Sequence, residues 1–437
     1  MARVRKAVGA LVGATAAGQL ILFATSILVA RLFTPAEMGV FVAVSAIAGI
    51  VGVLLSGRFE LAIPLPKREY DALLLARLVL GLVVLLGVLM TAALWLADAS
   101  AVPSWLSPAV SLYWGVPALC LANAAFLVGN HLAVRAQLYN SLAIRSLAYP
   151  AVAGIAQVSL GAAGLGAPGL VLGIAAGQLA AFAVTWLPAR RAMNLGSSSL
   201  LTKTNSDIKI RWSLPQTWTI AREYWRFPAF LAPAGVLNVL ATQLPVLIMT
   251  SYFGLAAAGQ YGMAMKLAAV PVGLLGASIG YIYSGELSKI ARDSIGGARR
   301  LLRDTSIRLF AVAVLAFLAV TLSGKLLVVW VMGAEWATAG TFIQVMAVAL
   351  AAQLVAAPLS QTLSVANAQL AQLSIDAARV MLVAGAAAWS IASGASPTEM
   401  VRSMAIGTTL GYVMLWFASH WAAQRIDAAV HASTNEN

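Results

Sequence analysis

The stretch GSSSLLTKTNSDIKIRW, residues 196–212, is a polar interruption in a chain that is otherwise almost continuously apolar. Of the 437 residues, 61% are hydrophobic and only 10% are charged. Soluble globular domains are typically about 25% charged, because a globule needs a charged surface to stay in water. The composition therefore excludes a soluble protein. It predicts a polytopic membrane protein that has this polar stretch in a loop outside the bilayer.

Apolar runs long enough to cross a bilayer lie on both sides of that loop. A transmembrane helix needs about 20 mostly apolar residues, and Gly, Pro and charged residues mark the ends of each run. The first run follows Arg3, Arg5 and Lys6, but it is longer than the apolar core of a signal peptide, so we expect a retained helix. The sequence predicts twelve helices, near residues 7–30, 37–57, 73–97, 108–133, 143–163, 167–189, 227–251, 257–284, 305–324, 338–364, 374–394 and 397–422.

The basic residues predict which side of the membrane each loop occupies. Cytoplasmic loops of membrane proteins carry an excess of Lys and Arg. With both termini in the cytoplasm, all but four of the 28 Lys and Arg residues fall in inside segments. The exceptions are Lys266, within a predicted helix, and Arg31, Lys325 and Arg402 outside. The net charge of +13 then reflects inside loops beside an anionic leaflet, and it needs no nucleic acid as a partner.

The polar loop divides the chain nearly in half, and a short repeat relates the halves. RLFTPAEMGVFV, residues 31–42, aligns with SYFGLAAAGQYG, residues 251–262, and each is the outside turn between the first two helices of its half. Six crossings is an even number, so both halves keep one orientation, and a pseudo-two-fold axis along the membrane normal relates them. We expect an all-α integral membrane fold of two six-helix bundles around a central cleft. The predicted domains are an N-terminal bundle (1–193), a cytoplasmic linker with an interfacial helix (194–224), a C-terminal bundle (225–424) and a cytoplasmic tail (425–437).

Several motifs are typical of one family. The longest block is EYWRFPAFLAPAGVLNVLATQLPVLIMTSYFGLAAAGQYGMAMKLAAVPVGLLGASIG, residues 223–280. The N-terminal half adds Pro35-x-Glu37-x-Gly39, Arg58-x-Glu60 and Leu65-Pro66, and the second half adds MGAEWATAG at 332–340. Together these motifs resemble the polysaccharide-biosynthesis (O-antigen type) flippases of the multidrug/oligosaccharidyl-lipid/polysaccharide exporter superfamily.

The resemblance implies a substrate, a place and a set of partners. It implies V-shaped exporter-type lobes that work by alternating access. It also implies translocation of an undecaprenyl-diphosphate-linked oligosaccharide across the bacterial cytoplasmic (inner) membrane. The product would feed assembly of a surface polysaccharide such as the O-antigen of lipopolysaccharide, capsule or exopolysaccharide. The implied partners are this lipid-linked glycan, membrane lipid, and the polysaccharide polymerase and chain-length machinery.

A diphosphate cannot cross hydrocarbon without desolvation, so the protein must offer cations in a wet cleft. Lys266 lies about nine residues into its predicted helix, which puts it about 13 Å deep, near the midplane. We predict that Lys266, Arg58, Arg31 and Glu60 form the substrate-binding set. The alternatives are a structural pair for Lys266 and interfacial anchoring for Arg31. Asn123, Gln243 and Asn238 are candidate polar residues of the cavity lining.

The stretch SGRFELAIPLPKR, residues 56–68, places Arg58 and Glu60 directly after the second apolar run. Residues two apart do not share a helix face, so a salt bridge within one helix is not expected. Either each side chain meets a different neighbour, or the helix has already ended. A gate or substrate-entry role at the cytoplasmic mouth is one interpretation, and simple topology and packing is the other.

Missing motifs narrow the function. The sequence has no Walker loop, no zinc-protease motif and no G-x-S-x-G elbow, so we expect neither an enzyme nor a cofactor or metal. Cys120 is the single cysteine and cannot form an intramolecular disulfide. Two alternatives to a flippase remain: an ion-coupled multidrug exporter, which would be expected to carry a mid-membrane acidic residue, and a membrane polysaccharide polymerase or ligase, which would need a large outside loop.

Overall fold

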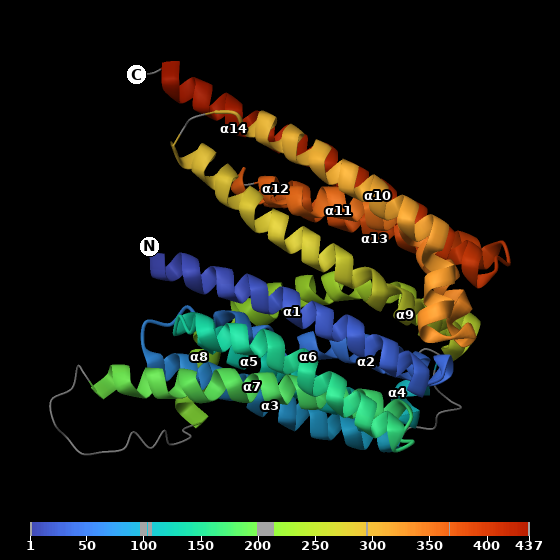
Figure 1. Ribbon diagram of the computed structural model, residues 1–437. Coiled ribbons are helices and arrows are strands. Elements are labelled where there is room, and N and C mark those ends of the chain that lie inside the picture. The colour runs from blue at the N-terminus through green and yellow to red at the C-terminus, as the bar shows by residue number, and fades with distance from the viewer. Residues whose placement is uncertain are drawn as a thin grey trace. The chain divides into compact units, whose positions relative to one another are not determined.

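The computed structural model describes residues 2–96, 103, 107–198, 214–293, 296–366 and 368–435, and these residues contain helices and turns but no strand. The prediction of an all-α fold is confirmed (Figure 1). The elements are α1 (Ala2–Leu32), α2 (Pro35–Ser56), η1 (Phe59–Ala62), α3 (Glu69–Leu96), α4 (Ser107–Ser111), α5 (Gly115–Arg135), α6 (Tyr139–Ala162), α7 (Ala167–Ser198), α8 (Leu214–Glu223), η2 (Phe227–Leu231), α9 (Ala232–Asp293), α10 (Ala298–Met332), η3 (Ala334–Trp336), α11 (Ala337–Leu359), α12 (Gln361–Val365), α13 (Gln369–Ala392) and α14 (Pro397–Asn435).

The chain forms two compact units, Met1–Ser251 and Tyr252–Asn437. The division falls inside α9, so the residues of α9 up to Ser251 pack with the first unit. The domain boundary predicted at the polar stretch stays a prediction, since residues 199–213 of that stretch lie outside the described part of the chain. The predicted linker, 194–224, does contain a short helix, α8, as expected, and Ile220 of α8 is buried in the core of the first unit.

Among the described helices, eight are long and apolar enough to cross a membrane, or nine if one bent pair in α9 counts as a single span. The chain is therefore a multi-pass membrane protein, but the predicted count of twelve spans is not confirmed. The difference arises in part from α6 and α14, which are long helices but are not apolar enough over a membrane-spanning length. Each carries polar and charged side chains along its length, and these lower its mean hydropathy.

In the first unit, the outside turn predicted at residues 31–36 is built by a capping box. Thr34 Oγ1 accepts a hydrogen bond from the backbone N–H of Glu37 at 3.3 Å, and Glu37 Oε2 accepts one from the N–H of Thr34 at 2.8 Å. Pro35 occupies the first helical position, where its missing N–H has no consequence. These contacts satisfy the free N–H groups at the start of α2, so the chain reverses direction sharply after α1.

In the second unit, the aligned turn uses a glycine in place of a capping residue. Gly254, which aligns with Thr34, has φ 80° and ψ 178° and breaks α9 between its two helical segments. The break lies between the predicted seventh and eighth helices, at 227–251 and 257–284, and confirms their separation. A left-handed φ favours glycine, because a Cβ would clash with the backbone.

Two long-range contacts hold the second unit together. Gln260 is buried, and its side chain donates to the carbonyl of Glu335 at 2.5 Å and accepts from the N–H of Ala339 at 2.8 Å. At the other end of the unit, the carboxylate of Asp427 in α14 accepts hydrogen bonds from the backbone N–H groups of Gly297, Ala298 and Arg299, at 2.9, 2.8 and 3.1 Å. These contacts satisfy backbone groups in the η3–α11 turn and at the start of α10.

We expect Gln260→Leu to destabilise the second unit, because it leaves the buried N–H of Ala339 and the part-buried carbonyl of Glu335 without their partner. The cost should be about 1–3 kcal/mol, or a fall in melting temperature of roughly 3–8 °C in detergent. Gln344→Leu is the matched control: Gln344 donates a single 2.8 Å hydrogen bond, to the carbonyl of Thr321 at an exposed position. Thermal unfolding of the two purified variants measures the difference. Equal shifts would show that the Gln260 contacts contribute little to stability.

Candidate functional site

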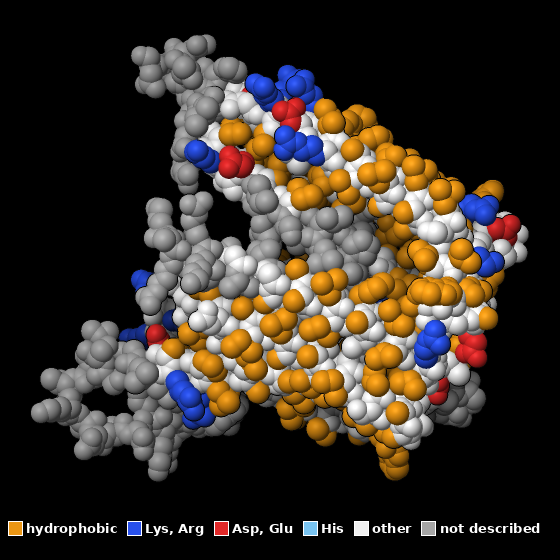
Figure 2. All heavy atoms as spheres, viewed as in Figure 1, with side chains coloured by type: hydrophobic (Ala, Val, Ile, Leu, Met, Phe, Trp, Pro, Cys, Tyr) orange, Lys and Arg blue, Asp and Glu red, His pale blue; other side chains and the backbone are white. Residues whose placement is uncertain are grey.

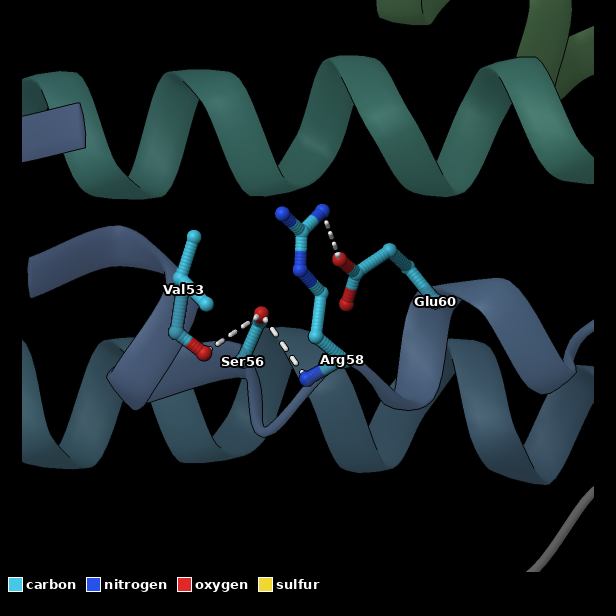
Figure 3. A network of polar contacts seen from close by, with 4 residues as sticks. All are labelled: Val53, Ser56, Arg58 and Glu60. Atoms are coloured by element: carbon cyan, nitrogen blue, oxygen red, sulfur yellow. Dashed lines mark hydrogen bonds and ion pairs between the residues drawn. The ribbon is translucent and has the colours of Figure 1, made fainter. Parts of the chain in front are cut away.

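The stretch that ends α2 has an unusual backbone. Gly57 and Arg58 both adopt left-handed conformations, with φ of 55° and 58°. The N–H of Arg58 donates to the hydroxyl of Ser56 at 3.3 Å, and that hydroxyl donates in turn to the carbonyl of Val53 at 3.3 Å (Figure 3). A left-handed conformation is uncommon for a residue other than glycine and incurs strain. The chain then enters the short helix η1, which contains Glu60.

This backbone brings Arg58 and Glu60 together. Arg58 Nη1 lies 3.6 Å from Glu60 Oε1, and Figure 3 shows the two side chains pointing toward each other. Because α2 ends at Ser56, the pair forms outside a helix, so the alternative that the helix has already ended is confirmed. The expectation that each side chain meets a different neighbour is wrong, because the left-handed turn replaces the helical spacing on which it rested.

Glu60 is the more deeply buried partner. Its residue is 1% exposed, while 22% of the Arg58 side chain is exposed. Its second oxygen, Oε2, has no hydrogen-bond partner in the described part of the chain. A buried carboxylate is costly unless a cation or donors compensate for the lost water. Glu60 therefore depends on Arg58 to compensate for its buried charge, while part of the Arg58 side chain is exposed at the surface of the unit.

The start of α9 is shaped to receive Arg58. A methyl group added at Gly235 would lie 2.5 Å from Nε of Arg58, so only glycine leaves room for the guanidinium there. Further back along α2, Gly49 similarly faces the amide of Gln243. Residues of α9 that belong to the first unit therefore lie directly against the end of α2.

A second arginine fixes the loop that follows η1. Arg135, at the end of α5, donates from Nη1 to the carbonyls of Pro64 and Pro66 at 3.1 and 2.7 Å. Sequence reasoning treats Arg135 only as an inside charge and misses this role. The sequence indicates this role only in part: a Pro-x-Pro segment does not form a helix, so its carbonyls need hydrogen-bond donors from elsewhere.

The other predicted site residues are scattered. Arg31 is exposed in the last turn of α1, and the length of α2, about 33 Å, separates that end from Arg58. Asn123 in α5 is half-buried, Gln243 lies beside α2, and Asn238 is exposed on α9. The structure thus groups Arg58, Glu60 and the Gln243 region and leaves Arg31 at the opposite end of α2.

Lys266 lies in the second unit, twelve residues beyond the break at Gly254. It is half-buried on the second segment of α9. No carboxylate in the described ranges forms an ion pair with it. The prediction of a structural partner for Lys266 therefore finds no support there, and its role in a cavity stays a prediction.

Two further arginines have partners within the helix bundles that the sequence does not indicate. Arg145 in α6 donates to the side chain of Asn130 at 2.5 Å, and its guanidinium carbon lies 5.0 Å from the centre of the Phe126 ring. Arg379 in α13 forms a 3.1 Å ion pair with Asp376 and lies 5.2 Å from the ring of Tyr412. The sequence indicates only inside charges at both positions, yet each arginine also connects two helices of its unit.

No group of three or more His, Cys, Asp or Glu side chains in the described residues is arranged to hold a metal ion. Cationic side chains are present at the ion-paired end of α2 (Arg58), beside the loop that follows η1 (Arg135) and at Lys266. Such cations in a multi-pass membrane protein suit an anionic ligand.

Solved structures with the same fold are membrane transporters. The chain resembles the lipid II flippase MurJ in an inward closed conformation, with a TM-score of 0.67 and 13% identity over 97% of this chain and 90% of that one. It also resembles an inward-facing multidrug resistance MATE family transporter of the MOP superfamily (TM-score 0.59, 14% identity, 95% and 96% coverage). A third is a point mutant of the Vibrio cholerae MATE transporter VcmN (TM-score 0.57, 16% identity, 97% of each chain). These likenesses define the fold as that of the flippases and exporters.

The sequence defines the family. Residues 28–341 match the profile of the polysaccharide biosynthesis protein family, so the chain belongs to that family. The suspected resemblance is thereby confirmed. No curated protein sequence matches the chain.

Proposed function

We propose that this protein flips undecaprenyl-diphosphate-linked oligosaccharide repeat units across the bacterial cytoplasmic membrane for assembly of a surface polysaccharide. The observation that carries the proposal is the family match over residues 28–341. The fold shared with a lipid II flippase supports it, since that neighbour moves a lipid-linked substrate, lipid II. In this proposal both termini are cytoplasmic, as the distribution of Lys and Arg indicates.

The physical task is to move a charged headgroup while its tail stays in lipid. The polyprenyl chain is soluble in hydrocarbon, but the diphosphate and sugars would lose their water. Cations in a wet cavity replace part of that hydration, and a protein that opens to each side in turn never exposes the headgroup to hydrocarbon. We assign the cation roles to Arg58, at the cytoplasmic mouth, and to Lys266, which the sequence places near the membrane midplane.

The Arg58–Glu60 pair gives the mouth a way to respond to substrate. An arriving diphosphate competes with Glu60 for the guanidinium, because both are oxyanions. When Arg58 turns to the phosphate, Glu60 is left buried beside a strained turn, and that state is costly. Binding therefore destabilises the resting conformation of the end of α2, which is what a gate requires.

The exporter alternative has a specific observation in its favour, because one structure with this fold is a multidrug resistance MATE family transporter and another is a MATE transporter. The deciding experiment is deletion of the gene. We expect loss of surface polysaccharide with accumulation of the lipid-linked precursor, and recovery of both on complementation. Unchanged polysaccharide together with increased drug sensitivity would favour the exporter. Loss of polymer with normal flipping of single repeat units would favour the polymerase or ligase.

We expect charge at residue 58 to matter more than shape. Arg58→Lys should retain substantial export, and Arg58→Gln should lose most of it. Arg58→Gln also strands the buried Glu60, which can cost about 3–5 kcal/mol, so the double variant Arg58→Gln/Glu60→Gln separates stability from function. The double variant should restore protein level without restoring export. Surface polysaccharide per molecule of inserted protein is the measurement, with the exposed Arg68→Gln as control. Normal export by the single or the double variant would show that the Arg58–Glu60 pair has only a packing role.

We expect Lys266→Ala to abolish export at normal protein level, because it removes a cation that has no ion-pair partner in the described residues. Lys266→Arg should retain part of the export. Lys289→Ala, on the same helix but exposed, is the matched control and should export normally. Surface polysaccharide measured in a deletion strain distinguishes these outcomes. Wild-type export by Lys266→Ala would remove Lys266 from the substrate path.

A further inference from the structure

The second unit contains an apolar groove between α10, α11 and α14. Its volume is about 630 Å³, within the range of ordinary ligand pockets. Its walls include Ile307, Phe310 and Val314 of α10, Val348 of α11, and Val413 and Phe417 of α14. These six side chains are between 38% and 64% exposed, so the groove is open along its length. None of the wall residues belongs to the predicted substrate-binding set.

The length of the groove fits one leaflet. On α10 its lining runs from Ser306 to Phe317, a rise of about 17 Å. Half of a bilayer's hydrocarbon is about 15 Å thick. A single acyl chain of a glycerophospholipid matches that length, whereas a long polyprenyl chain would extend well beyond it.

One end of the groove is closed by a polar contact. Trp416 Nε1 donates to the hydroxyl of Ser306 at 3.2 Å, and both residues line the groove. The ring of His420 lies tilted against that of Trp416, with 4.2 Å between ring centres and 57° between their planes. Beyond this point the two helices carry polar side chains, so the groove changes from apolar to polar where α10 begins.

Arginines continue the groove face of α10 past this contact. Arg303 lies three residues before Ser306 and Arg299 lies seven before it, and both spacings keep a side chain on one helix face. Both arginines are exposed. Figure 2 shows Lys and Arg side chains gathered where α10 begins, with hydrophobic side chains over the rest of the helix. On α14, His420 and Gln424 continue the opposite wall at the same spacing.

The carboxylates near these arginines leave cationic character at the groove end. Asp427 is used by the backbone N–H groups at the start of α10. Asp304 lies 3.5 Å from Arg303 and 3.9 Å from Arg300, in exposed pairs of the kind that contribute little. The end of the groove is therefore a cluster of arginines above an apolar channel one leaflet deep.

We propose that this groove is a binding site for an anionic glycerophospholipid. One acyl chain lies between α10, α11 and α14, and the phosphate headgroup contacts Arg303 and Arg299. Charge complementarity selects an anionic headgroup, and the length of the groove selects a chain from one leaflet. The bound lipid bridges three helices of the second unit and stabilises them relative to the unfolded unit. The site goes beyond the proposed function, because the lipid is not the transported substrate.

The test is lipid binding by the purified full-length protein, delipidated in detergent and measured by native mass spectrometry. The probes are phosphatidylglycerol and phosphatidylcholine with identical acyl chains. We expect wild-type protein to bind phosphatidylglycerol about tenfold more tightly or better. Arg299→Gln/Arg303→Gln should lower binding to the level of phosphatidylcholine. Arg308→Gln, on the opposite face of α10, is the matched control and should bind normally.

A second pair of variants tests the apolar part of the site. Val314→Trp fills the groove from α10 and should abolish tight binding, whereas Leu315→Trp, the neighbouring residue outside the groove, should retain it. Equal binding of the two phospholipids by wild-type protein would overturn the proposal. Normal binding by Val314→Trp would also overturn it, because the lipid would then be held only by attraction to the surface arginines. Displacement of phosphatidylglycerol by an equimolar amount of undecaprenyl phosphate would also overturn it, in favour of the carrier lipid.

Discussion

The constraint on which this structure depends is that a backbone polar group away from water must find a partner within the protein. Within a helix the backbone N–H and C=O groups pair with one another, so the groups that need other partners are those at the helix ends. The chain meets it with side chains from distant parts of the sequence: Asp427 at the start of α10, Gln260 at the η3–α11 turn, and Arg135 at the carbonyls of Pro64 and Pro66. Each contact fixes one element against another, so satisfying the helix ends also determines how the helices pack.

Much of the fold could be predicted because a helix that crosses hydrocarbon must be mostly apolar over about 20 residues. The apolar runs predicted α2, α3 and the break in α9 near Gly254 closely. The prediction for α10, 305–324, was too short, since hydropathy detects only the part of a helix that faces hydrocarbon. The helix begins at Ala298 because its Arg-rich first turns are polar yet helical and are capped by Asp427, and past Lys325 it continues through an apolar run to Met332. The same reason explains why α14 continues past 422 to Asn435.

The candidate site was harder to predict, because its geometry depends on one backbone conformation. Spacing rules applied to Arg58 and Glu60 assume a helix or a strand, and a left-handed Arg58 obeys neither. The residues themselves could be selected from sequence, since a cation and a carboxylate two residues apart directly follow an apolar run. Their pairing could not, and neither could the role of Gly235, whose missing side chain makes room for a guanidinium far earlier in the chain. Long-range contacts of this kind leave no periodic signal.

The two principal cations differ in a way that suits different steps of the proposed transport. Arg58 is held by Glu60 in a strained turn, so a ligand must displace a partner before the guanidinium becomes available, and occupancy is coupled to a change in backbone. Lys266 forms no ion pair with any carboxylate in the described ranges, so a phosphate meets it without competition. This difference in pairing follows from where carboxylates lie: Glu60 is buried beside Arg58, and no carboxylate forms an ion pair with Lys266 in the described part of the chain.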